Sequence, residues 1–347
     1  MKKYVSLLAI ALVMMFGSCT KQEVYEHEIT NTITIYINSQ TLDNGVNSAK
    51  TRSNATTRSA LTNDPKLVEN TVNTVTIAIF KSDGTVKTIK EFASPGNSVT
   101  MRVANLTTTD KVVCVANAKT GTFSGVKTLD EFNSVKISLD NAITTNNVNI
   151  VNNNLIMYGS GPIIANNDSY IANVDMYHLN TKISLNSFVV SLSNNATFKI
   201  KEVYLINVPS SFKFSYDNPY VADTYMYGSL NYGIPTQSQR LYLGSENLNG
   251  QVNKLFFYCS PNNSITYTKL VICGSYDADG NGPAQPQDTY YPIVIANNML
   301  ANKNYVINVT IKGIGVDKPT DDLNYSNLTV NMTINNFADV IKDVVLD

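Results

Sequence analysis

Few residues in this sequence have the types and spacing that catalysis requires. The 347-residue chain contains 2 histidines and 4 cysteines. His27 and His178 stand apart from any nucleophile or metal-ligand motif. No acidic pair is placed for general acid–base chemistry, which needs groups within hydrogen-bonding reach of one substrate. The sequence therefore predicts no catalytic site, no cofactor and no enzyme activity.

One acidic loop has the spacing of a cation site. Asp277–Gly282, followed by Asp288, matches the ligand positions of a calcium-binding loop. However, the segment is expected to link strands, Pro283 and Pro286 interrupt it, and Asp replaces the closing glutamate. We favour an Asp- and Gly-rich hairpin loop, with calcium binding as the alternative, and predict no metal site.

Three cysteines lie far along the chain, and an odd number cannot all pair within it. Cys259 and Cys273 could lie on neighbouring strands of a hairpin. Cys114 lies in the apolar run Val112–Val115, which has the composition of a core strand. A buried free thiol is expected there, because cysteine packs as a small apolar side chain. No disulfide is assigned.

The fourth cysteine follows a targeting segment. Lysines at positions 2 and 3 precede the apolar run Tyr4–Phe16, which is too short to span a bilayer and is typical of a signal peptide. Gly17–Cys19 resembles a bacterial lipobox, which implies cleavage before Cys19 and acylation of its thiol. The alternative is an ordinary cleavage site beside a chance cysteine. Thr20, where an aspartate would retain a lipoprotein in the inner membrane, favours the outer membrane.

Two arginines in small-residue settings, Arg52 and Arg58, are candidate protease sites. They lie in the segment Asn38–Asp64, which is rich in Asn, Ser, Thr and Ala and has no apolar pattern. Such a segment predicts a soluble tether that a protease can reach. The alternative interpretation is that both arginines only solubilise a linker.

Two segments, one near each end of the chain, have the alternating pattern of a strand with one buried face. They are Ile29–Ile37 and Leu328–Asn335. Successive side chains of a strand point to opposite faces, so each pattern predicts one apolar row. The two rows are Ile33, Ile35 and Ile37 in the first segment, and Leu328, Val330, Met332 and Ile334 in the second.

Composition and length restrict the fold class. Hydrophobic residues make up 43% of the chain and charged residues only 15%, and the net charge is −1, so no basic field exists to attract nucleic acid. Short strands separated by turn signals predict an all-β fold, and the length favours two tandem β-sandwich domains. We expect a lipoprotein signal peptide at 1–18, a propeptide with a removable first strand at 19–58, an N-terminal sandwich at 59–174 and a C-terminal sandwich at 175–347.

Taken in order, several short segments resemble the fimbrillin family, the pilins of the type V pili of Bacteroides-group bacteria. The resemblance covers nearly the whole chain and implies transthyretin-like, Greek-key sandwiches. It depends on the lipobox at Cys19, the strand-then-arginine segment that ends at Arg58, and the segments Val113–Ala118, Met157–Gly159, Phe257–Tyr258, Tyr290–Ile293, Asn304–Val309 and Gly313–Gly315.

This resemblance implies assembly by donor-strand exchange. An outer-membrane lipoprotein would be cut by an arginine-specific protease after Arg58, with Arg52 as the second choice. Removal of Cys19–Arg58 would take away the strand Ile29–Ile37 and open a groove. A C-terminal strand from about 325–347 of the next subunit would then fill it. Edge pairing supplies affinity, alternate side chains set the register, and head-to-tail joints generate a filament.

The predicted role is therefore a structural subunit of the polymerising fimbrial stalk, which supports adhesion. Its expected partners are like subunits, accessory pilus subunits, the protease and, before cleavage, the outer membrane. The mature protein would be extracellular. Two alternatives remain at this stage: an accessory tip or anchor subunit, and a monomeric glycan-binding lipoprotein on the cell surface.

Overall fold

The computed structural model describes residues 29–39, 68–143, 152–215, 222–228, 238–244, 255–282 and 287–337. Cys19, Arg52, Arg58 and His27 lie outside these ranges, as does the last part of the C-terminal segment after Phe337. Within the described ranges, no helix has the length and apolar character needed to cross a membrane.

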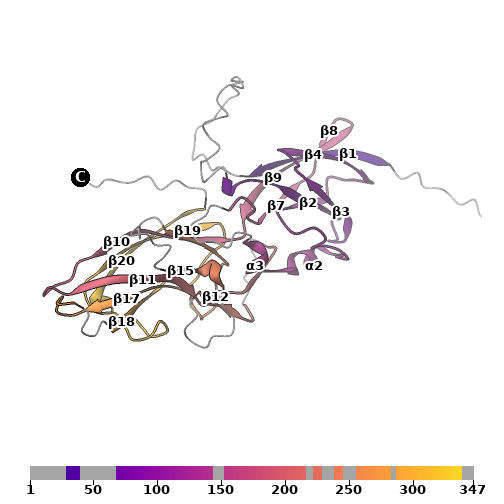
Figure 1. Cartoon of the computed structure of the whole chain (residues 1–347). Helices are drawn as coiled ribbons and strands as arrows, with labels where there is room; N and C mark the ends of the chain where they lie inside the picture. The colour runs from indigo at the N-terminus through magenta and orange to yellow at the C-terminus, as the bar shows by residue number, and fades with distance from the viewer. Residues whose placement is uncertain are drawn as a thin grey trace, which may run out of the picture.

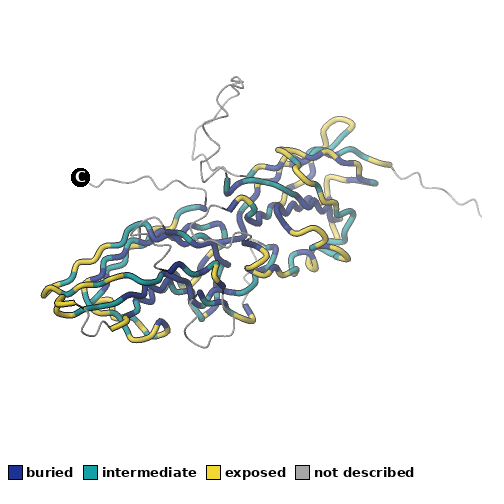
Figure 2. The backbone as a smooth tube through the Cα atoms, viewed as in Figure 1, coloured by how far each residue is buried: buried dark blue, intermediate teal, exposed yellow. Residues whose placement is uncertain are grey.

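The described chain forms two β-rich lobes, one built mainly from its first half and one from its second (Figure 1). Buried backbone runs through the middle of each lobe, and the exposed residues gather at loops and strand ends (Figure 2). The prediction of an all-β fold made of β-sandwiches is confirmed.

The N-terminal lobe is built on an eight-stranded sheet with the order β3-β2-β5-β7-β9-β1-β4, in which β8 also pairs with β9. Its strands are β1 (Thr30–Ser39), β2 (Thr74–Phe80), β3 (Val86–Ala93), β4 (Ser98–Ala104), β5 (Lys111–Ala116), β7 (Met157–Pro162), β8 (Ile164–Asn166) and β9 (Ser169–His178). The sheet folds over on itself, so apolar residues of β1 and β4 share one core with those of β2 and β5.

Close packing between β7 and β9 depends on glycine. A Cβ atom added to Gly159 would lie 2.3 Å from the carbonyl oxygen of Asp175, and one added to Gly161 would lie 2.3 Å from that of Asn173. Any side chain there would push β9 away from β7. The two glycines therefore help to hold β9, the strand against which β1 pairs.

Small elements cover the other face of this sheet and join the lobes. They are α2 (Leu129–Ser134), β6 (Lys136–Ser138) and α3 (Leu139–Ala142), and β6 pairs with β13 (Ser211–Lys213) from the second half of the chain. The α2 helix begins after Thr128, whose hydroxyl accepts a hydrogen bond from the Glu131 N–H at 3.1 Å, as an N-cap residue does.

The C-terminal lobe is a sandwich of two four-stranded sheets, with the orders β16-β10-β19-β20 and β15-β11-β17-β18. Their strands are β10 (Thr181–Val190), β11 (Thr197–Ile206), β15 (Tyr242–Gly244), β16 (Leu255–Cys259), β17 (Lys269–Asp277), β18 (Gln287–Val294), β19 (Lys303–Ile311) and β20 (Leu328–Asn336). The remaining elements are β12 (Val208–Pro209), β14 (Tyr225–Met226), η1 (Gln239–Leu241) and η2 (Tyr325–Asn327).

The two lobes place their first strands in the same way. In the N-terminal lobe, β1 lies between β9, to which it is parallel, and β4, to which it is antiparallel. In the C-terminal lobe, β10 lies between β19, to which it is parallel, and β16, to which it is antiparallel. The C-terminal lobe then adds β20 outside β19.

The possible arrangement of Cys259 and Cys273 on neighbouring strands of a hairpin does not occur. Cys259 lies on β16 and Cys273 on β17, which belong to opposite sheets of the C-terminal sandwich. Consecutive strands here cross from one sheet to the other, so closeness in sequence does not make them neighbours. Both thiols are free and buried, as is that of Cys114, and burial raises the pKa of Cys114 to about 12.

Candidate functional site

The strand β1 fills a slot between β9 and β4, one strand in from the edge of the N-terminal sheet. It pairs with β4 from Thr30↔Ala104 to Tyr36↔Ser98 on one side, and with β9 from Ile33↔Tyr170 to Ser39↔Met176 on the other. Its three inward side chains belong to the core: Ile33 and Ile35 are 0% exposed and Ile37 is 4% exposed. Backbone pairing on both edges and a buried apolar row together fix the strand in one register.

Polar side chains support β1 on its outer face and at its ends. The hydroxyls of Thr34 and Thr100 are hydrogen-bonded at 3.0 Å. At the end of the strand, the amide of Asn38 donates to a carboxylate oxygen of Asp175 on β9 at 3.1 Å. These contacts are exposed, so each adds a modest amount to stability and specifies which residue of β1 faces which neighbour.

The other candidate strand, β20, lies at the edge of a sheet in the other lobe. It pairs only with β19, antiparallel from Lys303↔Asn336 to Ile311↔Leu328. Its outer edge has no strand partner within the described part of the chain. An edge strand offers a row of backbone groups on which another strand can pair.

Burial of the apolar row of β20 decreases along the strand. Leu328 is 2% exposed, Val330 and Met332 are partly buried against the core, and Ile334 is 55% exposed. All four occupy alternate positions and share one face. The sandwich to which β20 belongs therefore buries only part of this row. The apolar pattern of the strand is longer than its own core requires.

An aromatic residue closes the end of β20. Phe337 is 2% exposed, and its backbone N–H donates to the carbonyl of Asn302 at 3.0 Å. Its ring packs against His178, with ring centroids 4.3 Å apart, and stacks on Tyr258 at 5.9 Å. We call these three residues the Phe337 cage. The cage ties the end of β20 to the junction of the two lobes, because His178 is the last residue of β9.

Charged groups lie beside this cage. Glu69 accepts from the Lys182 ammonium at 2.6 Å and from the Tyr258 hydroxyl at 2.5 Å. Lys182 also lies over the rings of Phe256 and Tyr258. The side chains of Glu69 and Lys182 are 3% and 12% exposed, so loss of either would leave a buried charge without its partner. Burial, and then the charge of Glu69, raise the pKa of Tyr258 far above its usual range.

His178 is held neutral in this setting. Burial, and then the nearby Lys182 charge, lower the pKa of His178 to about 3. One ring nitrogen, Nε2, lies 2.9 Å from Oδ1 of Asn70, while Nδ1 has no hydrogen-bond partner among the described residues. A proton on Nδ1 would be buried without an acceptor, so this histidine suits a structural role in the junction.

The acidic loop uses its carboxylates for its own turn. The Asp277 carboxylate accepts backbone N–H groups of Asp279, Gly280 and Gly282 at 3.2–3.3 Å. Asp288 forms an ion pair with Lys201. Across the part of the chain that the structure describes, no cluster of three His, Cys, Asp or Glu side chains could hold a metal ion. The geometry is that of a self-capped hairpin loop.

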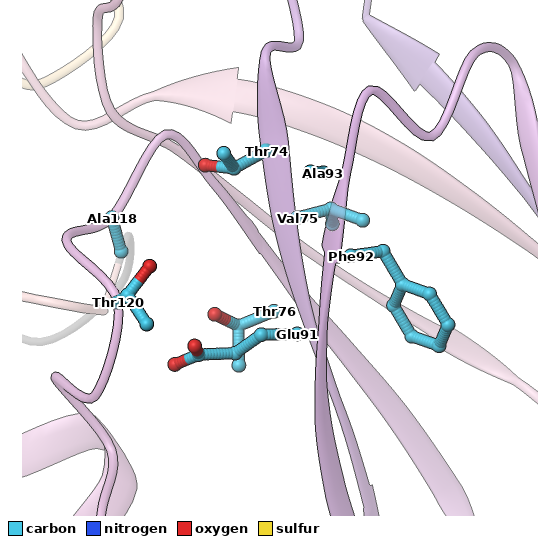
Figure 3. Close-up of a pocket in the computed structure, with 8 residues that line it drawn as sticks. All are labelled: Thr74, Val75, Thr76, Glu91, Phe92, Ala93, Ala118 and Thr120. Atoms are coloured by element: carbon cyan, nitrogen blue, oxygen red, sulfur yellow. The ribbon is translucent and has the colours of Figure 1, made fainter.

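A surface pocket of about 240 Å³ lies along β2 and β3. Eight residues line it: Thr74, Val75, Thr76, Glu91, Phe92, Ala93, Ala118 and Thr120 (Figure 3). Among these residues the one titratable group, Glu91, already accepts a hydrogen bond from the Gly121 N–H at 2.8 Å. The lining contains no His, Cys or Lys, and its one carboxylate is already hydrogen-bonded to the backbone, so the pocket does not resemble an active site.

The structure thus assigns the predicted residues to two separate places. Ile33, Ile35 and Ile37 lie in the β1 slot, and Leu328, Val330, Met332 and Ile334 lie on the β20 edge in the other lobe (Figure 1). The Phe337 cage and the Glu69–Lys182 pair were not predicted from the sequence. One signal was present: Lys182 is the only charge in the otherwise uncharged stretch Thr181–Leu185.

Comparison with known proteins gives a family and a fold. The family model of the major fimbrial subunit protein (FimA) matches residues 34–202, from the middle of β1 into β11. A search of curated proteins finds no match.

Several solved structures share the fold. The fimbrilin (FimA) of Porphyromonas gingivalis W83 is 18% identical, with 90% of this chain and 99% of that chain covered and a TM-score of 0.64. Two structures described as "putative cell adhesion protein" are similar as well. The one from Bacteroides eggerthii is 19% identical, with 89% and 97% covered and a TM-score of 0.65. The one from Parabacteroides distasonis is 16% identical, with 89% and 99% covered and a TM-score of 0.62.

At identities of 16–19%, the likeness to solved structures shows only the fold. The family model covers the N-terminal lobe and the first strands of the C-terminal lobe. Both agree with the resemblance found in the sequence. Residues 34–202 thus match the family of the major fimbrial subunit protein (FimA), and this match confirms the resemblance of the chain to the fimbrillin family.

Proposed function

We propose that the protein is a stalk subunit of a type V fimbria that polymerises by donor-strand exchange. It is exported as an outer-membrane lipoprotein acylated at Cys19, and an arginine-specific protease cuts it after Arg58. The cut separates β1 from the subunit, and β20 of the next subunit takes its place. The observation that carries this proposal is the contrast between β1, which is paired on both sides, and β20, which lies at the edge of its sheet among the described strands.

The position of β1 in the chain supports the proposal. It precedes the rest of the N-terminal sheet, and only residues 40–67 connect it to the next described part of the chain. Both candidate arginines, Arg52 and Arg58, lie within that connection. A single cut there would leave every other strand of the sheet in one covalent piece, so only β1 could depart.

Energetics explain why the cut must come first. Three buried isoleucines stabilise the slot by roughly 1.5–3 kcal/mol each. While the connection is intact, β1 acts as if present at a concentration of about a millimolar or more, because the connecting chain keeps it close. After cleavage β1 is a separate peptide that dilutes away once it dissociates, and a second strand can then compete for the slot.

The position of β20 supports its role as the donor. Leaving its own domain would break one ladder of backbone hydrogen bonds, and entering the slot would form two, to β9 and β4. The slot would also bury apolar side chains that its own sheet leaves partly exposed. The donor and the slot lie in different lobes, so one subunit can give a strand to the next while it receives one from the previous. Joints of this kind do not close, and they generate a filament.

Proteolysis of the purified precursor tests the proposal. We expect an arginine-specific protease to release a fragment that contains β1, with Ser59 as the new N-terminus, and filaments to grow from the cut protein. Arg58→Ala should prevent the cut and the filaments together, and Arg52→Ala serves as the matched control. If Arg52→Ala blocks assembly instead, the cleavage site moves to Arg52. If cut protein stays monomeric at high concentration, the proposal fails.

A second experiment separates a stalk subunit from the alternatives. A synthetic peptide of residues 327–337 should bind cut subunits, fill the slot and stop filament growth. A tip subunit would accept the peptide and would not act as a donor in a mixture with cut stalk subunits. A monomeric glycan-binding protein would ignore the peptide, and its sugar binding would not depend on cleavage.

A further inference from the structure

We infer the register of the joint: Thr329–Asn335 of one subunit takes the positions of Thr32–Asn38 in the next and runs in the same direction. The inference rests on the proposed strand exchange and goes beyond it by naming which residue replaces which. Three independent observations support it: the sequence match, the burial of the inward row and the polar contact at the strand end.

The first observation is a match over seven residues. Thr32–Asn38 reads Thr-Ile-Thr-Ile-Tyr-Ile-Asn and Thr329–Asn335 reads Thr-Val-Asn-Met-Thr-Ile-Asn. The first, sixth and seventh residues are identical, and apolar residues occupy the second, fourth and sixth positions of both. In this alignment Val330, Met332 and Ile334 take the places of the three isoleucines.

The second observation is the burial of the inward row. Ile334 is 55% exposed in its own lobe, while its counterpart in the slot, Ile37, is 4% exposed. Leu328 is already 2% exposed at home. The C-terminal sandwich therefore buries the start of the apolar row of β20, and the slot in the next subunit would bury its middle and end. The transfer would bury the one large apolar side chain of β20 that its own domain leaves in water.

The burial pattern also excludes a shift of two residues. If Met332 took the place of Ile33, Asn336 would fall at the buried position of Ile37, where its amide would lose water among apolar neighbours. If Leu328 took the place of Ile33, Ile334 would fall at Ser39, the last residue of the strand, and would gain little burial. A shift of one residue would turn the whole apolar row outward.

The third observation is the contact at the end of the strand. Asn38 donates from its amide to Asp175 on β9 at 3.1 Å. In the inferred register Asn335 takes this position and can make the same bond to Asp175 of the next subunit. At the position of Tyr36, which is 43% exposed, Thr333 requires no burial. In the reverse direction Thr329, with a shorter side chain, would face Asp175 instead.

Disulfide cross-linking of cut subunits tests the register. Ser98 is the β4 residue opposite Tyr36, so Thr333→Cys in the donor should cross-link with Ser98→Cys in the next subunit and give a ladder of covalent oligomers. Both sites are exposed, and the three native thiols of the described chain are buried. Thr333→Cys with Arg102→Cys is the matched control, since Arg102 lies opposite Thr32, and it should give no ladder.

Each other outcome identifies a different failure. Asn335→Cys with Ser98→Cys forms a ladder only if Met332 has shifted to the place of Ile33. Asn331→Cys with Ser98→Cys forms one if Leu328 has shifted to the place of Ile33 or if the strand runs in reverse, and of these two only the reverse direction also gives a ladder from Thr333→Cys with Thr100→Cys. Either result overturns the inference while filaments still form, so the proposed strand exchange survives. If the unmodified cut protein forms no filaments, the inference and the proposed function fall together.

A negative charge introduced at the end of the donor strand gives a second test that needs no cross-link. Asn335→Asp would place a carboxylate against Asp175 of the next subunit and should slow filament growth up to about fivefold. Asp175→Asn in the same chain should restore the rate. An Asn335→Asp defect that Asp175→Asn leaves unchanged would mean that the two residues do not meet in the joint.

Discussion

The two strands with matching apolar rows, β1 and β20, are held in opposite ways. β1 is an inner strand, paired on both edges, with all three inward isoleucines buried. β20 is an edge strand, paired on one side, with its apolar row leading from a buried Leu328 to an exposed Ile334. Strands of almost the same pattern thus contribute very differently to their domains.

Burial, and not the apolar pattern, therefore sets how much a strand contributes to the stability of its domain. The slot of β1 stabilises whichever suitable strand fills it, because both ladders and the core face are supplied by the domain. The edge of β20 holds its strand with one ladder, part of an apolar row and the Phe337 cage. A strand can leave such an edge at a lower free-energy cost than it can leave a slot.

Removing apolar bulk from each strand tests the comparison most strongly. The double variant Ile33→Ala/Ile35→Ala should destabilise the precursor by more than about 4 kcal/mol, because each buried isoleucine contributes roughly 2–5 kcal/mol. The matched pair Val330→Ala/Ile334→Ala should cost less than half as much, because both side chains are partly exposed at home. Urea unfolding measures both. Equal losses would refute the contrast between slot and edge.

The Phe337 cage gives the next largest effect. Phe337→Ala removes a buried ring, a change that typically costs about 3–5 kcal/mol. We expect hydrogen exchange of β20 amides to speed up strongly while β1 amides stay protected, because Phe337 directly follows β20 whereas β1 is held by its own ladders to β4 and β9. In Phe337→Leu, which keeps an apolar side chain, the exchange rate of the β20 amides should lie between those of the unmodified protein and Phe337→Ala. Equal loss of protection in both strands would mean that the cage supports the two lobes alike.

Acid should weaken the junction through His178. Its pKa is about 3 in the folded protein against 6.5 for the unperturbed group, so the unfolded chain takes up the proton first. The stability that comes from keeping His178 neutral in the folded protein is fully present above pH 6.5 and is lost as pH falls towards 3. Between pH 7 and pH 5 the loss is about 2 kcal/mol. His178→Gln should make the unfolding free energy less dependent on pH across this window. An unchanged slope would exclude His178 as the cause.

The smallest effect concerns the end of β1. Asn38→Ala removes an exposed hydrogen bond to Asp175 and should cost about 0.5–1 kcal/mol. Asp175→Ala should cost a similar amount, and the double variant should cost little more than either single change. Thermal unfolding of the four proteins gives the coupling between the two residues. If the two single losses of unfolding free energy simply add in the double variant, the hydrogen bond between Asn38 and Asp175 does not stabilise the end of β1.

Much of the fold could be predicted from the sequence because it depends on local pattern. The alternation in Ile33–Ile37 and in Leu328–Ile334 indicated strands with one apolar face, and both are strands. The apolar run around Cys114 indicated a core strand, and β5 is buried. The pairing of strands was not predictable in this way. The sequence allowed Cys259 and Cys273 to lie on one hairpin, and they lie on opposite sheets, because nothing local records where the chain changes sheet.

The periods, the apolar rows and the family resemblance can be read from the residue order alone, because successive side chains of a strand point to opposite faces. That β1 is paired on both sides and that β20 lies at an edge among the described strands follow from how the sheets assemble. The same assembly brings Phe337 to His178, and Glu69 to Lys182. These contacts join residues more than 100 positions apart. Which edges are covered, and which rings meet, depends on how whole sheets pack, and no spacing within one strand encodes that.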